Sequence, residues 1–332
     1  MKCRTCGQVA VINMRHHKLA LCGEHYLEWL PAQVQRFVEK QKLFTPHDRL
    51  LVAVSGGKDS LSLWDILLRL GYQADGLYIG LGIDEGIAYS EESHQKTVQF
   101  IEQFHPDASL HVVDVEQTYG MTIPELSRAR RRHDKPCSVC GLNKRHIMNR
   151  VAVEEGYVLV TGHNLDDEAA VLMQNMLRWQ TGYLARQSPL LESTHPKFAR
   201  KVKPLARVYE REMAAYALVR GIDYIYEECP FSVGATTLFH KTLLNQLEAH
   251  SPGAKLAFYL EFLRARQEGL FKEVQAGVQL HECDYCGQPT TAPGLCSFCR
   301  MWERGTPDIT HSLSPDPDLQ FAHFESAGAS DI

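Results

Sequence analysis

The most constraining feature of this chain is the hexapeptide Ser55-Gly56-Gly57-Lys58-Asp59-Ser60, which directly follows the apolar run 50–54. The pattern predicts a buried strand, a glycine-rich turn and a helix that begins at Asp59 or Ser60. Backbone N–H groups of such a turn, and the positive end of the helix, point at one anion. Lys58 adds a positive charge and Ser60 a hydroxyl group. The spacing differs from GxxxxGK[ST], so this is not the Walker P-loop of kinase-like nucleotide hydrolases.

The composition indicates a globular protein with one large domain and small additional modules. The chain has 332 residues, of which 44% are hydrophobic and 23% charged. No apolar run approaches the roughly 18 residues that span a bilayer, and the first residues lack a signal-peptide core. We therefore expect a cytoplasmic protein that does not enter a membrane.

Positive charge is concentrated in two places, although the formal net charge is −5. Local basic patches bind phosphates even when the net charge is negative. Solvated loop charges explain either cluster equally well. The clusters are Arg128, Arg130, Arg131, Arg132 and Lys135, and then Lys197, Arg200, Lys201 and Lys203.

Two groups of metal-ligand residues lie near the two ends of the sequence. Four nitrogen or sulfur ligands in paired knuckles suit tetrahedral zinc, and a closed four-ligand site is structural. Ten cysteines in a cytoplasmic chain also favour metal over disulfides. We predict two structural zinc sites that stabilise modules too short to hold a core, with RNA docking as a second role to consider. Their ligands are Cys3, Cys6, Cys22 and His25, and Cys283, Cys286, Cys296 and Cys299.

Three cysteines remain, namely Cys137, Cys140 and Cys229. Three thiolates suit a [4Fe–4S] cluster whose fourth iron is left open for a non-protein ligand. Two alternatives stay open at this point. One is a third zinc site completed by His133 or His146, and the other is a redox CxxC pair that carries a persulfide.

Strands and helices alternate from residue 48 onward. We expect strands at 50–54, 74–79, 110–115 and 157–160, and helices at 59–70, 90–104, 142–155 and 166–177. This alternation predicts an α/β fold with a doubly wound parallel sheet. Such sheets bind ligands beyond the carboxyl ends of the strands, where the strand order switches. In the common order 3-2-1-4-5, the first and fourth strands are neighbours.

The remaining segments complete the predicted domain organisation. We expect a helix at 24–43, loop structure over 179–199, and further helices at 210–220, 238–250 and 254–266. The predicted units are an N-terminal zinc finger (1–28), a helix and linker (29–47), a catalytic α/β domain (48–205), its helical part (206–275), a C-terminal zinc ribbon (276–304) and a disordered tail (305–332).

A second motif follows the fourth expected strand. In Thr161-Gly162-His163-Asn164-Leu165-Asp166-Asp167-Glu168-Ala169, Gly162 and His163 end the strand and three acidic residues begin a helix. Acidic residues at a helix N-terminus are favoured by its dipole alone. Beside a phosphate-binding loop, however, carboxylates are also suited to hold the Mg²⁺ that accompanies ATP.

Taken in order, these motifs resemble those of the TtuA type of tRNA 2-thiouridine synthetases, within the PP-loop ATPase (adenine nucleotide alpha hydrolase) superfamily. The resemblance covers roughly residues 1 to 302 and includes the zinc knuckle, SGGKDS, the CxxC segment, TGHNLDDEA, the lone Cys229 and the zinc ribbon. It departs at the tail, because the family often ends in basic residues whereas 308–332 is acidic and small.

The resemblance implies an enzyme that adenylates O2 of a uridine with ATP and then replaces that oxygen with sulfur. It places T-loop uridine 54 first as the target. It implies that Asp59, Lys144 and Asp167 are catalytic and that Cys137, Cys140 and Cys229 hold the cluster. The implied ATP-binding residues are Ala53, Ser55, Gly56, Gly57, Lys58, Asp59, Ser60, Gly162, His163 and Asp166. The implied cofactors are ATP, Mg²⁺, a [4Fe–4S] cluster and two Zn²⁺ ions.

The resemblance also implies partners: tRNA, a ubiquitin-like sulfur carrier with a C-terminal thiocarboxylate, and a second copy of the chain in a homodimer. Three rival functions stay open. The first is thiolation of wobble uridine 34 or cytidine 32. The second is another adenylating enzyme of the same loop group that needs no cluster. The third is a non-catalytic tRNA-binding scaffold.

Overall fold

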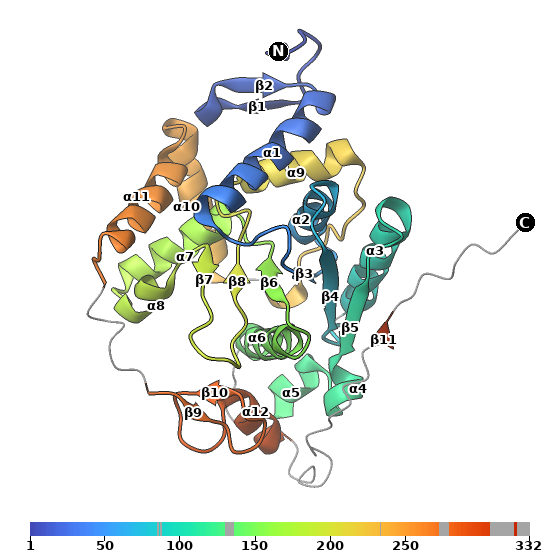
Figure 1. Cartoon of the computed structure of the whole chain (residues 1–332), viewed down its shortest axis with the longest axis vertical. Helices are drawn as coiled ribbons and strands as arrows, with labels where there is room; N and C mark the ends of the chain where they lie inside the picture. The colour runs from blue at the N-terminus through green and yellow to red at the C-terminus, as the bar shows by residue number, and fades with distance from the viewer. Residues whose placement is uncertain are drawn as a thin grey trace, which may run out of the picture.

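An open, mostly parallel β-sheet forms the centre of the molecule (Figure 1). The computed structural model describes residues 1–84, 86, 88–129, 136–232, 234–271, 279–305 and 322–323. In spatial order, the strands of the sheet are β11 (Ala322–His323), β5 (Leu110–Asp114), β4 (Ala74–Gly80), β3 (Leu50–Val54), β6 (Val158–Thr161), β8 (Lys201–Val202) and β7 (Leu190–Leu191).

The strand order confirms the predicted topology. β3 pairs in parallel with both β4 and β6, which places the four expected strands in the order 3-2-1-4. The carboxyl ends of β3 and β6, where the two motifs begin, are therefore adjacent. The two edge strands, β7 and β11, pair antiparallel with their neighbours, which the sequence did not predict.

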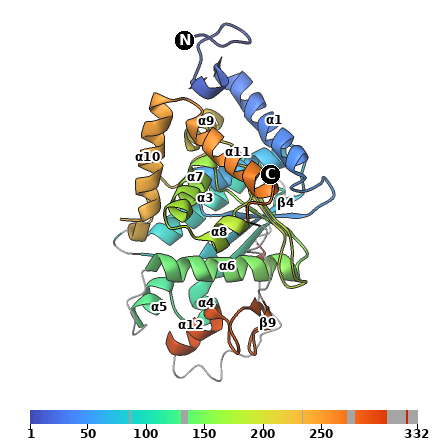
Figure 2. The ribbon, with the colours of Figure 1, turned by 90° about the vertical axis from the view of Figure 1, so that its left-hand side faces the viewer.

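Helices cover both faces of this sheet (Figures 1 and 2). The helices that contribute to the core on one face are α1 (Gly23–Gln41), α2 (Lys58–Arg69), α3 (Tyr89–Phe104), α7 (Leu165–Leu177), α8 (Thr181–Arg186), α9 (Glu210–Arg220) and α11 (Ala254–Gln267). The helices on the other face are α4 (Val115–Tyr119), α5 (Ile123–Ala129), α6 (Pro136–Glu154) and α12 (Ser297–Gly305). Helix α10 (Thr236–His250) packs against α7 and α11.

Alternate residues of the central strands enter the two cores, because side chains in a strand point to opposite faces. Val52 of β3 belongs to the core beneath α2, whereas its neighbour Leu51 belongs to the core beneath α6. Both are fully buried. Burial on both faces explains why β3 reads as a continuous apolar run and not as an alternating one.

The two cysteine-rich modules lie at opposite ends of the long axis (Figure 1). The N-terminal module contains the hairpin of β1 (Ile12–Met14) and β2 (Leu19–Leu21), joined by the short 3-10 helix η1 (Arg15–His17), and it leads directly into α1. The C-terminal module contains the hairpin of β9 (His281–Glu282) and β10 (Pro289–Thr290) and continues into α12, which packs on α5 and α6.

Several segments differ from the sequence-based expectation. Helix α6 begins at Pro136 and not at Leu142, so Cys137 and Cys140 lie within it. The region 179–199, expected to be a loop, contains α8 and β7, and α4 and α5 were not expected. A 3-10 turn, η2 (Pro230–Ser232), follows Cys229.

Some expectations fall outside the described residues. They include Arg130, Arg131, Arg132, His133 and Lys135, and most of the tail 305–332, of which only residues 305, 322 and 323 are described. Within the described part of the chain, no helix combines the length and the hydrophobicity needed to cross a bilayer.

Gly76 and Gly80 of β4 provide a matched test of the packing beneath α2. A Cβ atom on Gly76 would lie 2.5 Å from the Trp64 ring, which is fully buried and whose Nε1 donates to Ala74 O at 2.8 Å. A Cβ atom on Gly80 meets only ordinary contacts, at 3.6 Å or more. We expect Gly76→Ala to lower the free energy of unfolding by about 1–3 kcal/mol through overpacking, and Gly80→Ala to change it by less than about 1 kcal/mol. Denaturant titration checks this. Equal effects of the two variants would contradict the packing described.

Candidate nucleotide and metal sites

The turn between β3 and α2 can be built only with glycine at position 56. Gly56 has φ +69°, and a Cβ atom there would lie 2.4 Å from Ser93 O of α3. The turn is closed by Ser60, whose Oγ accepts from Ser55 N (3.2 Å) and donates to Gly57 O (3.0 Å). The predicted loop is therefore a tight turn that leads into the N-terminus of α2, with Gly57 as the N-cap.

Gly162 allows the second motif to approach this turn. A Cβ atom on Gly162 would lie 3.1 Å from Ser60 Cα, so the end of β6 passes close against the start of α2. Asn164 then caps α7 in a reciprocal capping box with Asp167. The Asn164 amide also donates to Asp59 Oδ1 at 3.2 Å. The two sequence motifs thus form one site.

A continuous chain of charges crosses this site. Lys58 Nζ lies 3.1 Å from Asp59 Oδ2 and 2.9 Å from Glu210 Oε1. Lys241 Nζ lies 3.1 Å from the other oxygen of Glu210 and 2.7 Å from Asp167 Oδ1. Glu210 begins α9 and Lys241 lies on α10, so four helices contribute to the chain of charges.

Sequence reasoning missed Glu210 and Lys241. Both lie on helices whose polar positions are typical of a solvated surface, and neither belongs to a recognisable motif. Only the packing of α9 against α2 and of α10 against α7 brings them to the nucleotide loop.

The electrostatics of the site suit a polyphosphate and a divalent cation. Burial raises the pKa of Asp59, and the negative charge of Asp167 raises it further, against the opposing effect of Lys58. Burial disfavours the charge on Lys241, yet Asp167 and Glu210 outweigh it and raise the pKa of this lysine. Lys58 and Lys241 therefore supply positive charge for phosphates. The two repelling carboxylates, Asp59 and Asp167, form a donor set that suits Mg²⁺.

Asp166 has a different environment from the one predicted for an ATP-binding residue. Its side chain is buried, with Oδ1 paired to Lys255 Nζ and Oδ2 accepting from Glu210 N at 2.9 Å. Both oxygens therefore bind within the protein. These contacts fix α9 and α11 relative to α7, and a role of Asp166 in ATP binding stays a prediction.

The remaining expected nucleotide residues lie at the same edge of the sheet. Ala53 lies in β3, directly beside Thr161 of β6. The Nδ1 atom of His163 lies 3.0 Å from Thr161 Oγ1, and burial, with the charge of Lys203, lowers the pKa of His163. His163 is therefore neutral at pH 7.

The three remaining cysteines meet between α6 and η2. Cys137 is exposed and its Sγ donates to Phe231 O at 3.0 Å, while Cys140 and Cys229 are half-buried. Burial raises the pKa of Cys140, and the charges of Cys229 and Cys137 raise it further. Burial, together with the charges of Cys229 and Cys140, raises the pKa of Tyr89 to about 12. The three thiols are therefore near enough to influence one another's ionisation, and Cys140 and Cys229 pack against the core beneath α6.

The spacing of these sulfur atoms does not suit a single zinc ion. Sulfur ligands of tetrahedral zinc lie about 3.8 Å apart, as follows from Zn–S bonds of about 2.3 Å. The ligand atoms of each zinc group described below all lie within 4.8 Å of one another, but those of Cys137, Cys140 and Cys229 do not. Of the two histidines considered as a fourth ligand, His146 instead stacks on Phe298 at 3.7 Å, and His133 is outside the described residues. The three cysteines therefore stay a predicted ligand set for an iron–sulfur cluster.

Lys144 and Lys201 provide amines that lack a carboxylate partner within the described residues. Lys144 follows Cys140 by one turn of α6, and its charge opposes the rise in the pKa of that thiol. The other three residues of the second basic cluster have carboxylate partners. Lys203 pairs with Glu168 at 2.7 Å, Arg200 pairs with Glu192, and Lys197 pairs with Glu282. Burial, Lys203 and Arg145 lower the pKa of Lys201 to about 8.

Both predicted zinc groups are assembled. Ligand atoms of Cys3, Cys6, Cys22 and His25 lie within 4.8 Å of one another, and so do those of Cys283, Cys286, Cys296 and Cys299. Pairwise distances are 3.1 Å from Cys22 Sγ to His25 Nδ1 and 3.8 Å from Cys286 Sγ to Cys296 Sγ. One Cys₃His set and one Cys₄ set at these separations fit tetrahedral zinc.

The fold and the glycine turn define a PP-loop protein, and comparison with known families agrees. A model described as "PP-loop domain" matches residues 28–230, and one described as "2-thiouridine synthetase TtuA, N-terminal LIM domain" matches residues 2–27. The chain belongs to the TtuA family of PP-loop proteins.

Curated relatives cover nearly the whole chain. It is 50% identical over 307 residues to the tRNA-5-methyluridine(54) 2-sulfurtransferase of Thermus thermophilus, with 91% of each chain covered. It is 44% identical to the protein of the same name from Thermotoga maritima, with 91% of this chain and 96% of the relative covered. Among solved structures, the U34-tRNA thiolase NcsA from Methanococcus maripaludis with its [4Fe-4S] cluster matches with a TM-score of 0.73 and 25% identity, over 92% of this chain and 96% of that chain.

If each group of four ligands binds its own zinc ion, replacing one ligand should release zinc from that group alone. We expect Cys22→Ser and Cys283→Ser each to remove one zinc ion per chain and to unfold only the affected module, because such modules depend on metal binding for their folding. Elemental analysis and limited proteolysis check this. Cys137→Ser serves as the matched control and should leave both zinc ions bound. Loss of zinc from the control would contradict the assignment.

Lys201 should titrate well below other lysines. Because burial and two neighbouring cations lower its pKa from 10.5 to about 8, it becomes a neutral, nucleophilic amine as the pH rises through about 8. We expect mass spectrometry to show acylation of Lys201 with a midpoint near pH 8. Lys96, whose pKa is raised by Asp223, is the control and should react only at higher pH. A midpoint for Lys201 at or above that of Lys96 would contradict the environment described.

Proposed function

We propose that this protein is a tRNA 2-thiolation enzyme that converts the T-loop uridine 54 (5-methyluridine) to its 2-thio form with ATP and a sulfur donor. The observation that carries the proposal is the convergence of the nucleotide loop with Asp167 and Lys241 beside the adjacent ends of β3 and β6. The curated relatives named for this activity match over 91% of the chain and support the same target.

In the first step, O2 of the uridine forms a bond to the α-phosphorus of ATP, and pyrophosphate leaves. The turn around Gly56 and Gly57 and the N-terminus of α2 would bind the phosphates. Lys58 and Lys241 would neutralise the charge that develops on the leaving pyrophosphate. Lys144, which approaches from α6, would contact the α-phosphate or the base oxygen.

Asp59 and Asp167 would hold Mg²⁺ beside these phosphates. Their carboxylates face each other closely enough for the charge of Asp167 to raise the pKa of Asp59. A divalent ion relieves this repulsion and binds oxygen donors of this kind. The capping box fixes the Asp167 side chain, and the Asn164 amide fixes Asp59, so both would be held in place before the metal binds.

In the second step, sulfur bonds to C2 of the base and AMP leaves with the former O2. Cys137, Cys140 and Cys229 would hold a [4Fe–4S] cluster, which supplies a site for a soft sulfur nucleophile when bound. NcsA of Methanococcus maripaludis, whose structure carries such a cluster, supports this part of the proposal. Tyr89 and Phe231 would limit access of water to the three thiolates.

A ubiquitin-like carrier protein with a C-terminal thiocarboxylate completes the proposed reaction as sulfur donor, and a homodimer is the proposed assembly. A cytoplasmic location is also part of the proposal. The relative named cytoplasmic tRNA 2-thiolation protein 1 of Aspergillus niger, 30% identical over 307 residues, supports it.

The wobble position is the second candidate target. The match to NcsA, named a U34-tRNA thiolase, favours it specifically. Identity to that protein is 25%, against 50% for the Thermus thermophilus relative, so uridine 54 is the first choice.

Mapping thiolated nucleosides in tRNA tests the target and the cluster ligands together. We expect cells that lack this gene to lose the 2-thio group at position 54, and the wild-type gene to restore it. A Cys137→Ser gene should fail to restore it, and the purified variant should lose iron while keeping both zinc ions. Loss of thiolation at position 34 alone would show that uridine 34, and not uridine 54, is the substrate. No change in any thiolated nucleoside would reject the thiolase function.

Lys241 should be required for ATP use. Lys241 pairs with Asp167 and Glu210, and the proposal places its cation against the phosphates of ATP. Replacing it by Met would remove that contact, and a hydrogen bond to a charged group contributes about 1.5–3 kcal/mol. We therefore expect Lys241→Met to raise the KM for ATP about 10- to 100-fold in tRNA-dependent AMP release, whereas Lys241→Arg retains most activity. Lys40→Met on the exposed face of α1 is the control. An unchanged KM in Lys241→Met would exclude a role in phosphate binding.

A further inference from the structure

A third group of metal-ligand side chains lies where the hairpin of the N-terminal module contacts the body of the protein. It consists of His16 and His17 of η1 and Glu212 in the first turn of α9. One ligand atom from each of the three residues lies within 4.8 Å of the other two. The group shares no residue with the four-ligand group of the same module, so it forms a separate candidate site.

Two of these ligand atoms are buried without a hydrogen-bond partner. His16 Nε2 and Glu212 Oε1 lie only 3.2 Å apart. Their orientation makes no hydrogen bond between them, and neither atom bonds to any other residue that the structure describes. A buried polar atom without a partner costs about 1–3 kcal/mol. The pair therefore calls for a group that can bind both atoms at once.

The separation of the two atoms is close to that of two ligands of one tetrahedral metal ion. Bonds of about 2.0–2.2 Å from zinc to nitrogen and oxygen place neighbouring ligand atoms about 3.3–3.5 Å apart, against the 3.2 Å between His16 Nε2 and Glu212 Oε1. Two imidazoles and one carboxylate are also a common ligand set for zinc, and they leave the fourth position open to water.

The surrounding contacts hold the three side chains in place. The ring of His16 packs on that of Tyr209 with centroids 4.1 Å apart, and the ring of His17 packs edge-on to Trp29 at 5.1 Å. The second carboxylate oxygen of Glu212, Oε2, accepts from Tyr209 N at 3.0 Å, so this bond orients Oε1 toward His16. Such supporting contacts fix the orientation of metal ligands before the ion binds.

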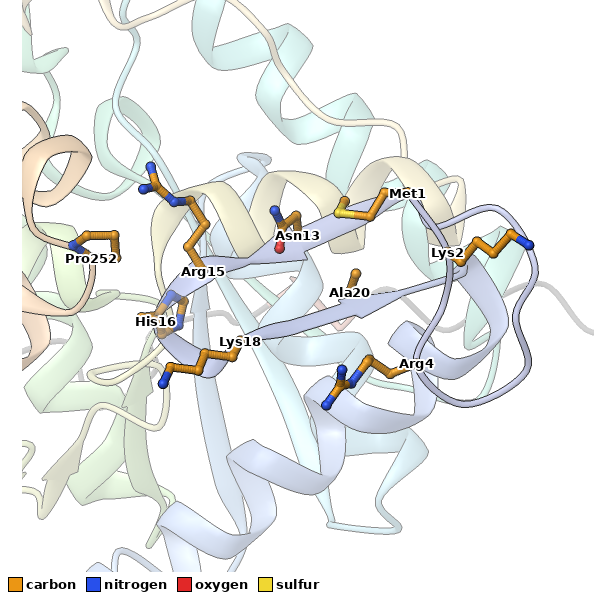
Figure 3. A pocket seen from close by; sticks show the side chains of 9 residues that line it. All are labelled: Met1, Lys2, Arg4, Asn13, Arg15, His16, Lys18, Ala20 and Pro252. Carbon is orange, nitrogen blue, oxygen red and sulfur yellow. The ribbon is translucent and has the colours of Figure 1, made fainter.

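A metal ion can reach this group from solvent. His17 is exposed, and a groove of about 670 Å³, lined in part by His16 and Pro252, opens beside the end of the hairpin (Figure 3). Arg15 and Lys18 flank His16 there and would repel a cation. Both are exposed, however, so solvent and salt weaken this repulsion.

We propose that His16, His17 and Glu212 bind a third divalent metal ion of the zinc class. The ion joins the hairpin of the zinc module to α9, whose first residue, Glu210, contacts Lys58 and Lys241 at the nucleotide loop. Because it has only three protein ligands, this ion exchanges more readily than an ion in either group of four. The proposal does not depend on the reaction that the enzyme catalyses.

Counting zinc after partial removal tests the site. The full chain is dialysed against a mild chelator until two zinc ions remain, and is then equilibrated with a low concentration of Zn²⁺. We expect elemental analysis to find one zinc ion more per chain in wild type than in His17→Gln or Glu212→Gln. His47→Gln changes an exposed histidine outside all three groups and should match wild type. Zinc bound elsewhere is the same in all four proteins and cancels in the difference.

Both ligand variants are expected to fold. Glutamine at position 212 can still accept from Tyr209 N, as in other capping boxes, and His17 is exposed. Amide hydrogen exchange then reports whether the ion holds the hairpin. In wild type, exchange over residues 12–21 should slow about tenfold when free Zn²⁺ exceeds its dissociation constant tenfold. The same addition should leave exchange in Glu212→Gln unchanged.

Other outcomes overturn the proposal. If wild type takes up no third zinc ion, His16 and Glu212 form an ion pair and nothing more. If His17→Gln or Glu212→Gln contains as much zinc as wild type, the replaced residue is not a ligand and the set of three is wrong. If His47→Gln also lacks the third ion, the loss does not report on this group. Slower exchange in Glu212→Gln on adding Zn²⁺ would place the ion elsewhere.

Discussion

The pairing of β3 with β6 is the constraint on which the rest of the structure depends. Two parallel strands that are distant in sequence become neighbours, and each ends in a segment that begins a helix. The contact is tight at Gly162, since a Cβ atom there would come within 3.1 Å of the α2 backbone and would require it to shift. This close approach aligns the N-termini of α2 and α7, so that two positive helix ends and two acidic side chains meet in one place. The supporting helices then bring further charges to a site that the sheet has already located.

Much of this arrangement could be predicted from sequence because the relevant signals are local. The apolar run at 50–54, the SGGKDS turn and the paired knuckles each specify their own geometry over a few residues. The order of the first four strands follows from the preference of alternating strands and helices for one topology. The strand order is confirmed by the structure, which also brings together the two groups of four residues predicted to bind zinc.

The parts that escaped prediction depend on tertiary packing. Glu210 and Lys241 carry no motif. Glu210 reaches Lys58 because α9 packs against α2, and Lys241 reaches Glu210 from α10, which packs against α7. Asp166 looks identical to Asp167 in sequence, yet one is buried against Lys255 and the other faces the site. Successive residues of a helix point about 100° apart, because there are 3.6 residues per turn. Which of the two side chains is buried therefore depends on the elements that pack around α7.

The position of Glu210 between two lysines has a consequence for selectivity. Without nucleotide, its carboxylate neutralises Lys58 and Lys241 from within the protein. An entering anion must displace this internal counter-ion, so a monovalent anion such as chloride gains little by exchange. In the proposed reaction, a magnesium-bound triphosphate would carry several charges and would offer its metal to Asp59 and Asp167, which would compensate for releasing Glu210. The arrangement of these four side chains would therefore disfavour simple salts relative to such a ligand.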